Sequence, residues 1–570
     1  MGKPTEIKKE KNMKKFTKLL SLVLAIFIAF GAAACFGKSG SSGEDHLDIY
    51  LLYKGYGDAW LKPLMEDFVE QDWVKEKYPG ITSENVSYTS NSVDADQYNK
   101  LNSGESINNY DLMFGVNLQG YEDRGIIADL TDSVYLTEVP GESGVKVIDK
   151  VPQRILDRVR RAKAPEREDG NDTYHVVSYI DGMFGMIYNH DILTDKDGLN
   201  LPVPLTTEQF KEVGDAIIEK GYKSSIADNE NTVIMNNAND DYWRSSYDVW
   251  WAQYEGIENV NAYYEGYDKK NDLKGSKKVL SQHGRLESLQ VVEDILESYS
   301  YEKSQSGIDY KRAQTYFLEG RGLFHYNGSY FASEMAIELE TCEYDIRFMK
   351  MPVISSIVEK LDLYEDEGVE FNDLDATKKK AYDEKLRIII ADVDADKTYD
   401  ESAAKGAGIS EDDFDIVAAA RCVGGNAGAG GHAVVIPEYS PAKGIAADFL
   451  RFMFTDKAIR TFASASKGIL FPSTYDVAND AELMAEFDNV SKSSIEMLKG
   501  TDNYEFTRIP PAASTTLGKA GLTSLHFDGR FEVMFRQTGA NRMTAEDIIA
   551  AEAEFWSDSN WTQMVNSSVQ

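Results

Sequence analysis

The chain has 570 residues, of which 42% are hydrophobic and 11% aromatic, so it can bury sizeable cores. Its length predicts two or more domains. The formal net charge of -35 opposes binding to phosphate polymers and to anionic lipid headgroups, which excludes nucleic acid as a partner class. The net charge does not indicate which neutral ligand the protein could bind.

The first 35 residues have the pattern of a bacterial lipoprotein signal. Seven lysines precede an apolar run at residues 19–30, and the sequence GAAAC follows at residues 31–35. A basic region, an apolar region and a small-residue cleavage site in this order resemble a lipobox, so we expect cleavage before Cys35 and lipidation of Cys35, including palmitate. A retained spanning helix is the alternative, but it needs about 20 apolar residues and this run is shorter. Ala32 stands where a lipobox usually has leucine.

The segment after Cys35 is typical of a flexible tether. Residues 37–43 read GKSGSSG, which offers too few apolar groups to pack and behaves as coil. We therefore expect a signal peptide at residues 1–34, a lipidated tether at residues 35–45 and a folded body from His46. No later stretch predicts a bilayer crossing, so lipid is the expected membrane attachment.

The first folded segment predicts a parallel α/β sheet. A buried strand at residues 47–53 ends in the loop KGYG, and a helix with apolar residues at helical spacing follows, with Asp58 as its expected N-terminal cap. Further strands are expected at residues 86–88 and 110–114. Strand, helix and strand in this order indicate parallel pairing. Ligands of such sheets bind beyond the carboxyl ends of the strands, here residues 53–58 and 115–120.

The middle of the chain predicts a second lobe built in the same way. Residues 175–179 and 183–188 read as extended, and Thr206 to Gln209 (TTEQ) resemble a capping box that opens a helix. An amphipathic helix is expected at residues 286–296. The segment at residues 316–330, YFLEGRGLFHYNGSY, is the strongest internal signal after the lipobox.

Four segments together resemble a known family. They are residues 47–68, residues 182–210 with the sequence IYN at 187–189, residues 317–330, and residues 431–473, which contain GHAVVIP, SPAK and GILFPS. Each segment alone is weak evidence for a family, but the order of the four segments over residues 46–556, behind a lipobox, makes the combined match specific. The chain resembles family 1 of the extracellular solute-binding proteins, the maltose-binding-protein-like receptors of carbohydrate ABC transporters.

This resemblance implies an α/β protein with the type II periplasmic-binding fold, whose two lobes are joined by a multi-strand hinge and close around a ligand in the cleft between them. By analogy, the N-terminal lobe holds residues 46–178 and 430–478, and the C-terminal lobe holds residues 182–425 and 482–570. The resemblance further implies a carbohydrate ligand, ABC permease subunits as partners and a monomer. It places the protein on the extracellular face of a bacterial, Gram-positive-type cell membrane, with no cofactor and no metal.

The acidic stretch at residues 359–415 is longer than the family core needs. It holds Asp392, Asp394, Asp396 and Asp400, which suggests calcium, but an EF-hand-like loop would need glycine in place of Lys397. We therefore interpret it as a solvated surface insertion. Two further cysteines, Cys342 and Cys422, either pair in an oxidising compartment or stay buried as small apolar residues.

Candidate ligand residues come first from the two loops. Tyr53, Tyr56 and Asp58 lie in or beside the first loop, and Asn117 lies in the second. Aromatic faces cover the C–H faces of sugar rings, while carboxylates and amides bind hydroxyls. The alternative is that these residues only form a turn and contact no ligand; Asp58, for example, can serve as a helix cap and nothing more.

Four more candidates come from later segments. Asp181 falls where related proteins place a carboxylate at the crossover between lobes, although Asp181-Gly182 also makes an ordinary turn. Trp243 and Trp250, with Trp251, offer stacking surfaces, yet their spacing also fits one helical face packed in the core. Tyr330 follows Asn327-Gly328-Ser329, where the family has an aromatic platform, and its alternative is a core aromatic at a strand end.

An extracellular glycosidase with two carboxylates is the main alternative function. The sequence has no HExxH, GxSxG, CxxC or Walker-type motif, and its 7 histidines show no metal-ligand spacing. The family resemblance favours binding without turnover, and a receptor for another polar solute, such as a peptide, is the further alternative. A surface scaffold would need repeats, and none is present.

Overall fold

The computed structural model describes most of the folded body of the chain. The described ranges are residues 45–104, 109–116, 121–161, 167–196, 198–222, 233–235, 240–265, 267–268, 273–274, 277–300, 309–366, 368–426, 432–498, 505–507 and 542–568. Cys35 and the signal and tether segments before residue 45 lie outside these ranges, as does Asn117.

The first lobe is built on a five-stranded sheet in the order β2-β1-β3-β12-β4. β1 (Leu47–Leu52) pairs in parallel with β2 (Val86–Asn91) and with β3 (Leu112–Val116). β12 (Ala433–Val435) returns late in the chain and pairs antiparallel with β3 and with β4 (Val177–Ser178). The predicted strands and their parallel pairing are therefore confirmed.

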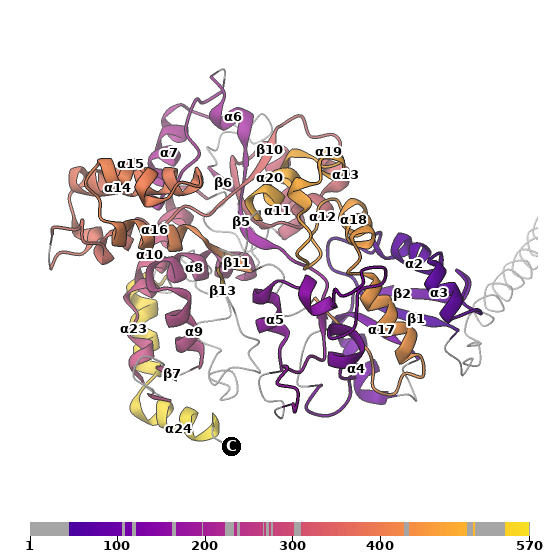
Figure 1. Cartoon of the computed structure of the whole chain (residues 1–570). Coiled ribbons are helices and arrows are strands. Elements are labelled where there is room, and N and C mark those ends of the chain that lie inside the picture. Colours follow the sequence, from indigo (N-terminus) through magenta and orange to yellow (C-terminus); the bar gives the residue numbers. More distant parts are fainter. Residues whose placement is uncertain are drawn as a thin grey trace, which may run out of the picture.

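Helices cover this sheet and share its core. Trp60 is fully buried, and its ring lies 5.3 Å from that of Phe114, 5.5 Å from that of Tyr179 and 5.0 Å from that of Phe462. Residues far apart in sequence thus form one core, in the lower right of Figure 1. The helices are α2 (Leu61–Val69), α3 (Asp72–Lys77), α4 (Asp94–Ser103), η2 (Thr131–Tyr135), η3 (Val147–Lys150), α5 (Gln153–Val159), α17 (Lys443–Phe452) and α18 (Asp456–Ala465).

The predicted cap of the first helix is wrong. The residue that precedes α2 is Trp60, and no side chain caps this helix. Asp58 instead reaches Tyr88, whose pKa is raised by burial and by its hydrogen bond with Asp58. The backbone carbonyl of Asp58 accepts the Leu61 N–H at 3.1 Å, so Asp58 belongs to the turn before the helix and its carboxylate faces β2.

The second lobe is built on a six-stranded mixed sheet. β13 (Glu505–Thr507), β11 (Val423–Asn426), β5 (Met183–Asn189), β9 (Phe324–Gly328) and β6 (Ile234–Met235) follow in this order, and β10 (Ile346–Met349) also pairs with β5. β5 and β9 run antiparallel with Phe184 opposite Gly328. The predicted strand at residues 183–188 is confirmed.

Most helices of the chain surround this second sheet. The predicted helix start at Thr206 is confirmed, because its hydroxyl accepts the Gln209 N–H at 3.1 Å; the Gln209 side chain binds the Leu205 N–H instead of closing the box. The helices include α6 (His190–Thr194), α7 (Thr207–Glu219), α8 (Asp240–Glu255), α9 (Ile257–Glu265), η5 (Lys277–Leu280), α10 (His283–Ser298), α11 (Tyr310–Leu318), α12 (Phe331–Glu334), α13 (Ala336–Leu339), η9 (Val477–Asn479), α19 (Ala481–Ala485), α20 (Asn489–Leu498), α23 (Ala545–Phe555) and α24 (Asp558–Ser568). A short hairpin, β7 (Tyr267–Asp268) with β8 (Leu273–Lys274), lies beside α9.

The acidic stretch at residues 359–415 is a packed helical unit, so its interpretation as a solvated insertion is wrong. It follows η6 (Ser355–Lys360) and contains η7 (Phe371–Asp373), α14 (Ala376–Asp394), η8 (Tyr399–Glu401), α15 (Ala403–Gly406) and the start of α16 (Glu411–Arg421). Leu386, Ile389 and Phe414 join the core of the second lobe. Several of its acidic side chains pair with protein cations; Asp394, for example, pairs with Arg421 and Lys350.

The two lobes lie side by side, with the insertion and the C-terminal helices on the far side of the second lobe (Figure 1). None of the helices within the described ranges has both the length and the apolar character needed to cross a membrane. Cys342 and Cys422 are both free thiols, so of the two alternatives the structure supports separate, half-buried cysteines.

Candidate ligand site at the lobe junction

The loop after β1 carries three candidate residues with different surroundings. Tyr53 is 38% exposed, while Tyr56 is buried. A turn closes between Lys54 and Gly57, where the Gly57 N–H donates to the Lys54 carbonyl at 3.0 Å and Gly57 has a φ of 72°. Glycine adopts this backbone conformation without strain, and the turn leaves the Tyr53 ring at the surface while the Tyr56 ring enters the protein.

Tyr56 belongs to a buried polar cluster with Tyr179 and His432. The Tyr56 hydroxyl lies 3.1 Å from the Tyr179 hydroxyl and 2.7 Å from Nδ1 of His432. Burial, reinforced by the charges of Lys54 and Arg158, lowers the pKa of His432 to about 3. Burial also raises the pKa of Tyr56, so all three groups are neutral at pH 7. The cluster offers uncharged hydrogen-bonding groups behind the loop.

The same loop contacts the second lobe directly. The Ser333 hydroxyl on α12 donates to the Tyr56 carbonyl at 3.3 Å. Gly55 lies against the carboxylate of Glu334 on the same helix. Tyr330, just before α12, is half-buried against the core of the first lobe, and its ring meets that of Phe184 on β5 edge-on at 5.7 Å. Tyr53, Tyr56 and Tyr330 are thus gathered at one junction between the lobes.

Glu334 is a half-buried acid at this junction. The Gln314 amide donates to Oε2 of Glu334 at 2.7 Å. Burial raises the pKa of Glu334 to about 7, against smaller lowering effects of the Gln314 hydrogen bond and of Lys311. Glu334 therefore changes charge close to neutral pH, next to the loop that carries Tyr53 and Tyr56.

Asp181 lies where the chain crosses from the first lobe to the second. Its carboxylate forms a two-point ion pair with the guanidinium of Arg154 on α5, in which Nη1 lies 2.9 Å from Oδ1 and Nη2 contacts Oδ2. Its backbone N–H donates to the Leu470 carbonyl at 2.8 Å. The side chain is buried, so this acid holds α5 and the late crossover at residue 470 together.

The tryptophan candidates lie on α8. Trp250 and Trp251 are fully buried; Trp250 donates its indole N–H to the Pro352 carbonyl at 3.0 Å, and Trp251 donates to Oε1 of Gln282 at 2.8 Å. Both rings are packed in the core, as in the alternative interpretation, because aromatic side chains at helical spacing fill the interior between α8 and its neighbours. The side chain of Trp243 is outside the described part of the structure, as is Asn117.

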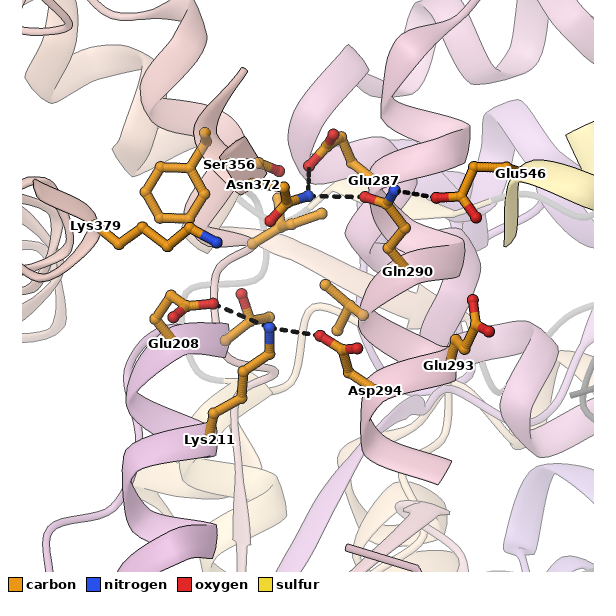
Figure 2. Close-up of a pocket in the computed structure, with 14 residues that line it drawn as sticks. Glu208, Lys211, Glu287, Gln290, Glu293, Asp294, Ser356, Asn372, Lys379 and Glu546 are labelled. Carbon is orange, nitrogen blue, oxygen red and sulfur yellow. Dashed lines mark hydrogen bonds and ion pairs between the residues drawn. The ribbon is translucent and has the colours of Figure 1, made fainter. Parts of the chain in front are cut away.

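A separate polar cavity of about 270 Å³ lies wholly in the second lobe. Residues of α7, α10, η6, η7, α14 and α23 line it, and none of the described candidate residues is among them. Figure 2 shows Lys211 between two acids, with its ammonium 3.0 Å from Glu208 and 2.6 Å from Asp294. The cavity is lined by many charged side chains, including the ion-paired Lys211, so the junction with its tyrosines is the better candidate site for a neutral ligand.

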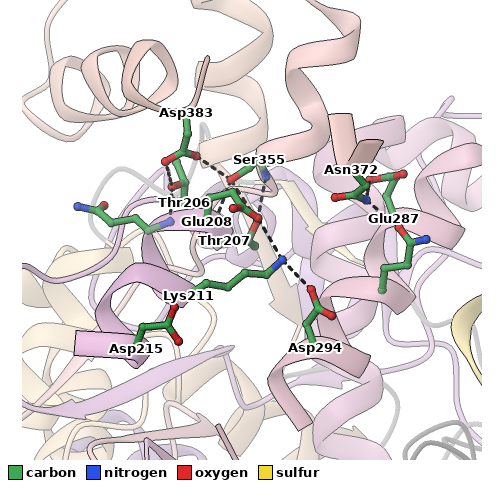
Figure 3. Close-up of polar contacts among 12 residues, drawn as sticks. Thr206, Thr207, Glu208, Lys211, Asp215, Glu287, Asp294, Ser355, Asn372 and Asp383 are labelled. Atoms are coloured by element: carbon green, nitrogen blue, oxygen red, sulfur yellow. Dashed lines mark hydrogen bonds and ion pairs between the residues drawn. The ribbon is translucent and has the colours of Figure 1, made fainter. Parts of the chain in front are cut away.

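Hydrogen bonds fasten the insertion to the start of α7 beside this cavity. The Asp383 carboxylate on α14 accepts bonds from Thr206 at 2.9 Å and from Ser355 at 2.7 Å (Figure 3). Burial raises the pKa of Asp383 despite the nearby Arg387. The residue that caps α7 therefore also positions the insertion.

Sequence reasoning missed four residues of the junction: Arg154, Tyr179, Glu334 and His432. His432 stands inside the GHAVVIP segment that carries the family resemblance, and Glu334 follows Tyr330 by four residues on a helix. A helical reading of residues 330–334 would have placed Glu334 next to Tyr330. Arg154 and Tyr179 have no local signal, because their partners lie far away in sequence.

Comparison with known proteins points to one family. A model of the family described as bacterial extracellular solute-binding protein matches residues 54–284. This part of the chain therefore resembles a bacterial extracellular solute-binding protein. The matched residues include the junction loop after Tyr53, the crossover at Asp181, and helices α7 to α9. No curated protein sequence matches this chain significantly.

Solved structures show the fold of this chain. It is similar to a chitin oligosaccharide binding protein at 13% identity and a TM-score of 0.53, over 92% of this chain and 100% of the other. It is also similar, at 13% identity and a TM-score of 0.51, to a protein from work on xylan utilization by Caldanaerobius polysaccharolyticus, over 90% of this chain and 100% of the other. The protein has the type II periplasmic-binding fold with two α/β lobes, as predicted.

Proposed function

We propose that this protein is a solute-binding protein that serves as the carbohydrate receptor of an ABC importer, that it captures an oligosaccharide between its lobes without turning it over, and that lipid on Cys35 tethers it outside the cell. The family match carries the proposal, since members of this family bind solutes. A similar fold in a chitin oligosaccharide binding protein supports a saccharide ligand. Permease delivery follows from the transporter type of the family.

The chemistry of the junction suits a neutral, hydroxyl-rich ligand. Tyr53 presents an exposed ring and Tyr330 a half-buried one, and aromatic faces cover sugar C–H surfaces. Tyr56 and Asp58 supply hydroxyl and carboxylate groups in the same loop, with Asp181 at the crossover behind them. We propose these five residues as the sugar contacts among the described residues. Trp250 is left out because its ring has no exposed face.

Calorimetry of the full chain against a panel of sugars tests this function. The panel contains chitin oligosaccharides, xylan oligosaccharides and maltooligosaccharides, with a set of short peptides as the matched control. We expect at least one oligosaccharide to bind with one site per chain and to raise the Tm, with unchanged sugar recovered afterwards. Turnover of the bound sugar would establish the glycosidase alternative, and binding of peptides alone would establish the peptide receptor.

A Cys35→Ala variant tests the tether separately. Lipid on Cys35 predicts that the native chain fractionates with membranes and that the variant appears in the soluble fraction. Cys342→Ala is the matched control, because it removes a cysteine from the folded body and should leave the membrane fraction unchanged. If the Cys35 variant stays with the membranes, the chain has another anchor.

A further inference from the structure

One histidine and two glutamates converge in the second lobe, away from the lobe junction. His283 and Glu287 are one turn apart on α10, and Nε2 of His283 lies 3.1 Å from Oε1 of Glu287. The same nitrogen lies 3.6 Å from Oε2 of Glu359 on η6. The three atoms all lie within 4.8 Å of one another.

Glu287 is the decisive member of this group. Its side chain is only 2% exposed, and Oε1 contacts Nε2 of His283 as an ion pair but accepts no regular hydrogen bond from the described residues. The other oxygen, Oε2, accepts a bond from the Asn372 amide at 2.9 Å (Figure 2). A buried carboxylate oxygen whose partner among the described residues is this one imidazole has capacity left for a further ligand.

Neighbouring groups fix the other two ligands. The Tyr254 hydroxyl donates to Oε2 of Glu359 at 2.6 Å, and the Phe371 N–H donates to Oε1 at 2.5 Å. The imidazole of His283 rests edge-on against the Tyr254 ring at 5.8 Å. Outer hydrogen bonds that orient carboxylates in this way are a regular feature of metal sites.

We propose that His283, Glu287 and Glu359 bind a divalent transition-metal ion, with zinc as the fitting example. A zinc ion at its usual bond lengths holds tetrahedral ligands about 3.3 Å apart, and the two His283 separations of 3.1 and 3.6 Å bracket this spacing. One imidazole and two carboxylates suit zinc, cobalt or manganese better than calcium, which prefers oxygen alone. Two carboxylates also balance the charge of the ion.

The surroundings leave room for a solvent ligand. His283 is 34% exposed, so water completes the coordination from that side, as in zinc sites with three protein ligands. Lys360, the residue after Glu359, is directed elsewhere, since its ammonium lies 3.3 Å from Glu255 and 4.5 Å from the centre of the Tyr254 ring. The ion would join α10 to the segment where the insertion begins, and so clamp the insertion to the lobe.

A second histidine cluster in the structure differs in the decisive point. Nε2 of His46 lies 3.5 Å from Oδ2 of Asp111. Both oxygens of Asp111 already accept hydrogen bonds, Oδ1 from Ser440 at 2.7 Å and Oδ2 from the Asp48 N–H at 3.0 Å. The buried acid of this cluster, unlike Glu287, has a regular hydrogen-bond donor on each oxygen, so His46→Ala serves as the matched control for His283→Ala.

Titration of the full chain with zinc after chelator treatment tests the site. We expect one equivalent of zinc to bind tightly, binding to be lost in His283→Ala and Glu359→Gln, and His46→Ala to bind as the native chain does. Asn372→Ala, which removes the donor to Glu287 together with its bond to Gln290 but no proposed metal ligand, should weaken binding about tenfold. Cobalt in place of zinc should give visible absorption bands in the native chain that His283→Ala lacks.

Thermal unfolding gives an independent readout. Because the ion binds only the folded chain, saturating zinc should raise the Tm of the native protein by at least about 3 °C, and His283→Ala should show no such rise. Equal zinc binding by the native chain and by both ligand variants would overturn the proposal, as would no binding of zinc, cobalt or manganese by the native chain. His283 is partly exposed, so its alanine variant keeps the test valid if Glu359→Gln does not fold.

Discussion

Gly55 lies directly against the carboxylate of Glu334, so that a Cβ atom on Gly55 would come within 2.0 Å of Oε1. The two residues belong to different lobes, one to the loop after β1 and the other to α12. This close approach, together with the Ser333 hydrogen bond to the Tyr56 carbonyl, places the aromatic side chains of the loop at the junction. The lobe contact thus depends on the absence of a side chain at residue 55.

Gly55→Ala should loosen this contact. The new methyl group forces Glu334 away from Gln314, so we expect a loss of about 1–2 kcal/mol in the free energy of unfolding. Denaturant unfolding of Gly55→Ala, Glu334→Ala and the double variant measures the coupling. In the Glu334→Ala background the added methyl group should cost little. Additive losses would mean that the strain lies elsewhere in the loop.

Glu334 should make the stability of the protein depend on pH. Its pKa is raised by burial to about 7 in the folded chain, from the ordinary glutamate value of 4.5. The folded state therefore binds this proton more tightly, so its stabilising effect is complete below pH 4.5 and is lost as the pH rises through 7. The loss amounts to about 3 kcal/mol.

Glu334→Gln removes that titration while keeping a group that can accept the Gln314 bond. Between pH 5 and 8 the Tm of the native chain should fall more than that of the variant, and the variant should be the more stable protein at pH 8. Differential scanning fluorimetry across this range makes the comparison. Parallel Tm profiles for the two proteins would show that Glu334 does not carry the pH dependence.

Tyr53 and Tyr56 should separate ligand binding from stability. Tyr53 is exposed, so Tyr53→Ala should change the free energy of unfolding by less than about 0.5 kcal/mol but weaken sugar binding up to about tenfold, because a stacking ring is lost. Tyr56→Phe removes the contacts with Tyr179 and His432 and should cost about 1–2 kcal/mol in stability. Unchanged sugar affinity in Tyr53→Ala, measured by calorimetry, would remove Tyr53 from the site.

Local patterns in the sequence predicted the sheets but not the junction. Alternation and apolar runs predict β1, β3 and β5. The cap at Thr206 can be predicted as well, because its partner, Gln209, is three residues away. Asp58 looked like such a cap, but its partner Tyr88 lies on the neighbouring strand. The pairing of Tyr56 with His432 joins residues 376 positions apart, and no local pattern encodes such a contact.

The insertion and the metal cluster show the same limit. Charge along residues 359–415 suggested a solvated surface, yet Leu386, Ile389 and Phe414 lie on the inner faces of its helices. Histidine spacing alone gave no metal signal, although His283 and Glu287 are four residues apart on a helix. The third member, Glu359, comes from another element, so the cluster exists only in the folded chain.

The ion pair between Arg154 and Asp181 should contribute more to the free energy of unfolding than the exposed ion pairs of the same lobe. Arg154 is 19% exposed and Asp181 9%, whereas Asp132, which pairs with Arg167, is 74% exposed. Asp181→Asn leaves a largely buried guanidinium without its full counter-charge, so we expect a loss of about 2–3 kcal/mol. Asp132→Asn is the matched control and should cost less than about 0.5 kcal/mol.

The same variant tests the proposed ligand role of Asp181. Calorimetry at a temperature where Asp181→Asn is fully folded isolates binding from stability, and a sugar contact predicts a rise in Kd of about tenfold, since one hydrogen bond to a charged group is lost. Arg154→Met breaks the same ion pair without touching the carboxylate. If both variants raise Kd equally, Asp181 acts by holding α5 against the crossover at residue 470; a larger rise in Asp181→Asn assigns the carboxylate to the ligand.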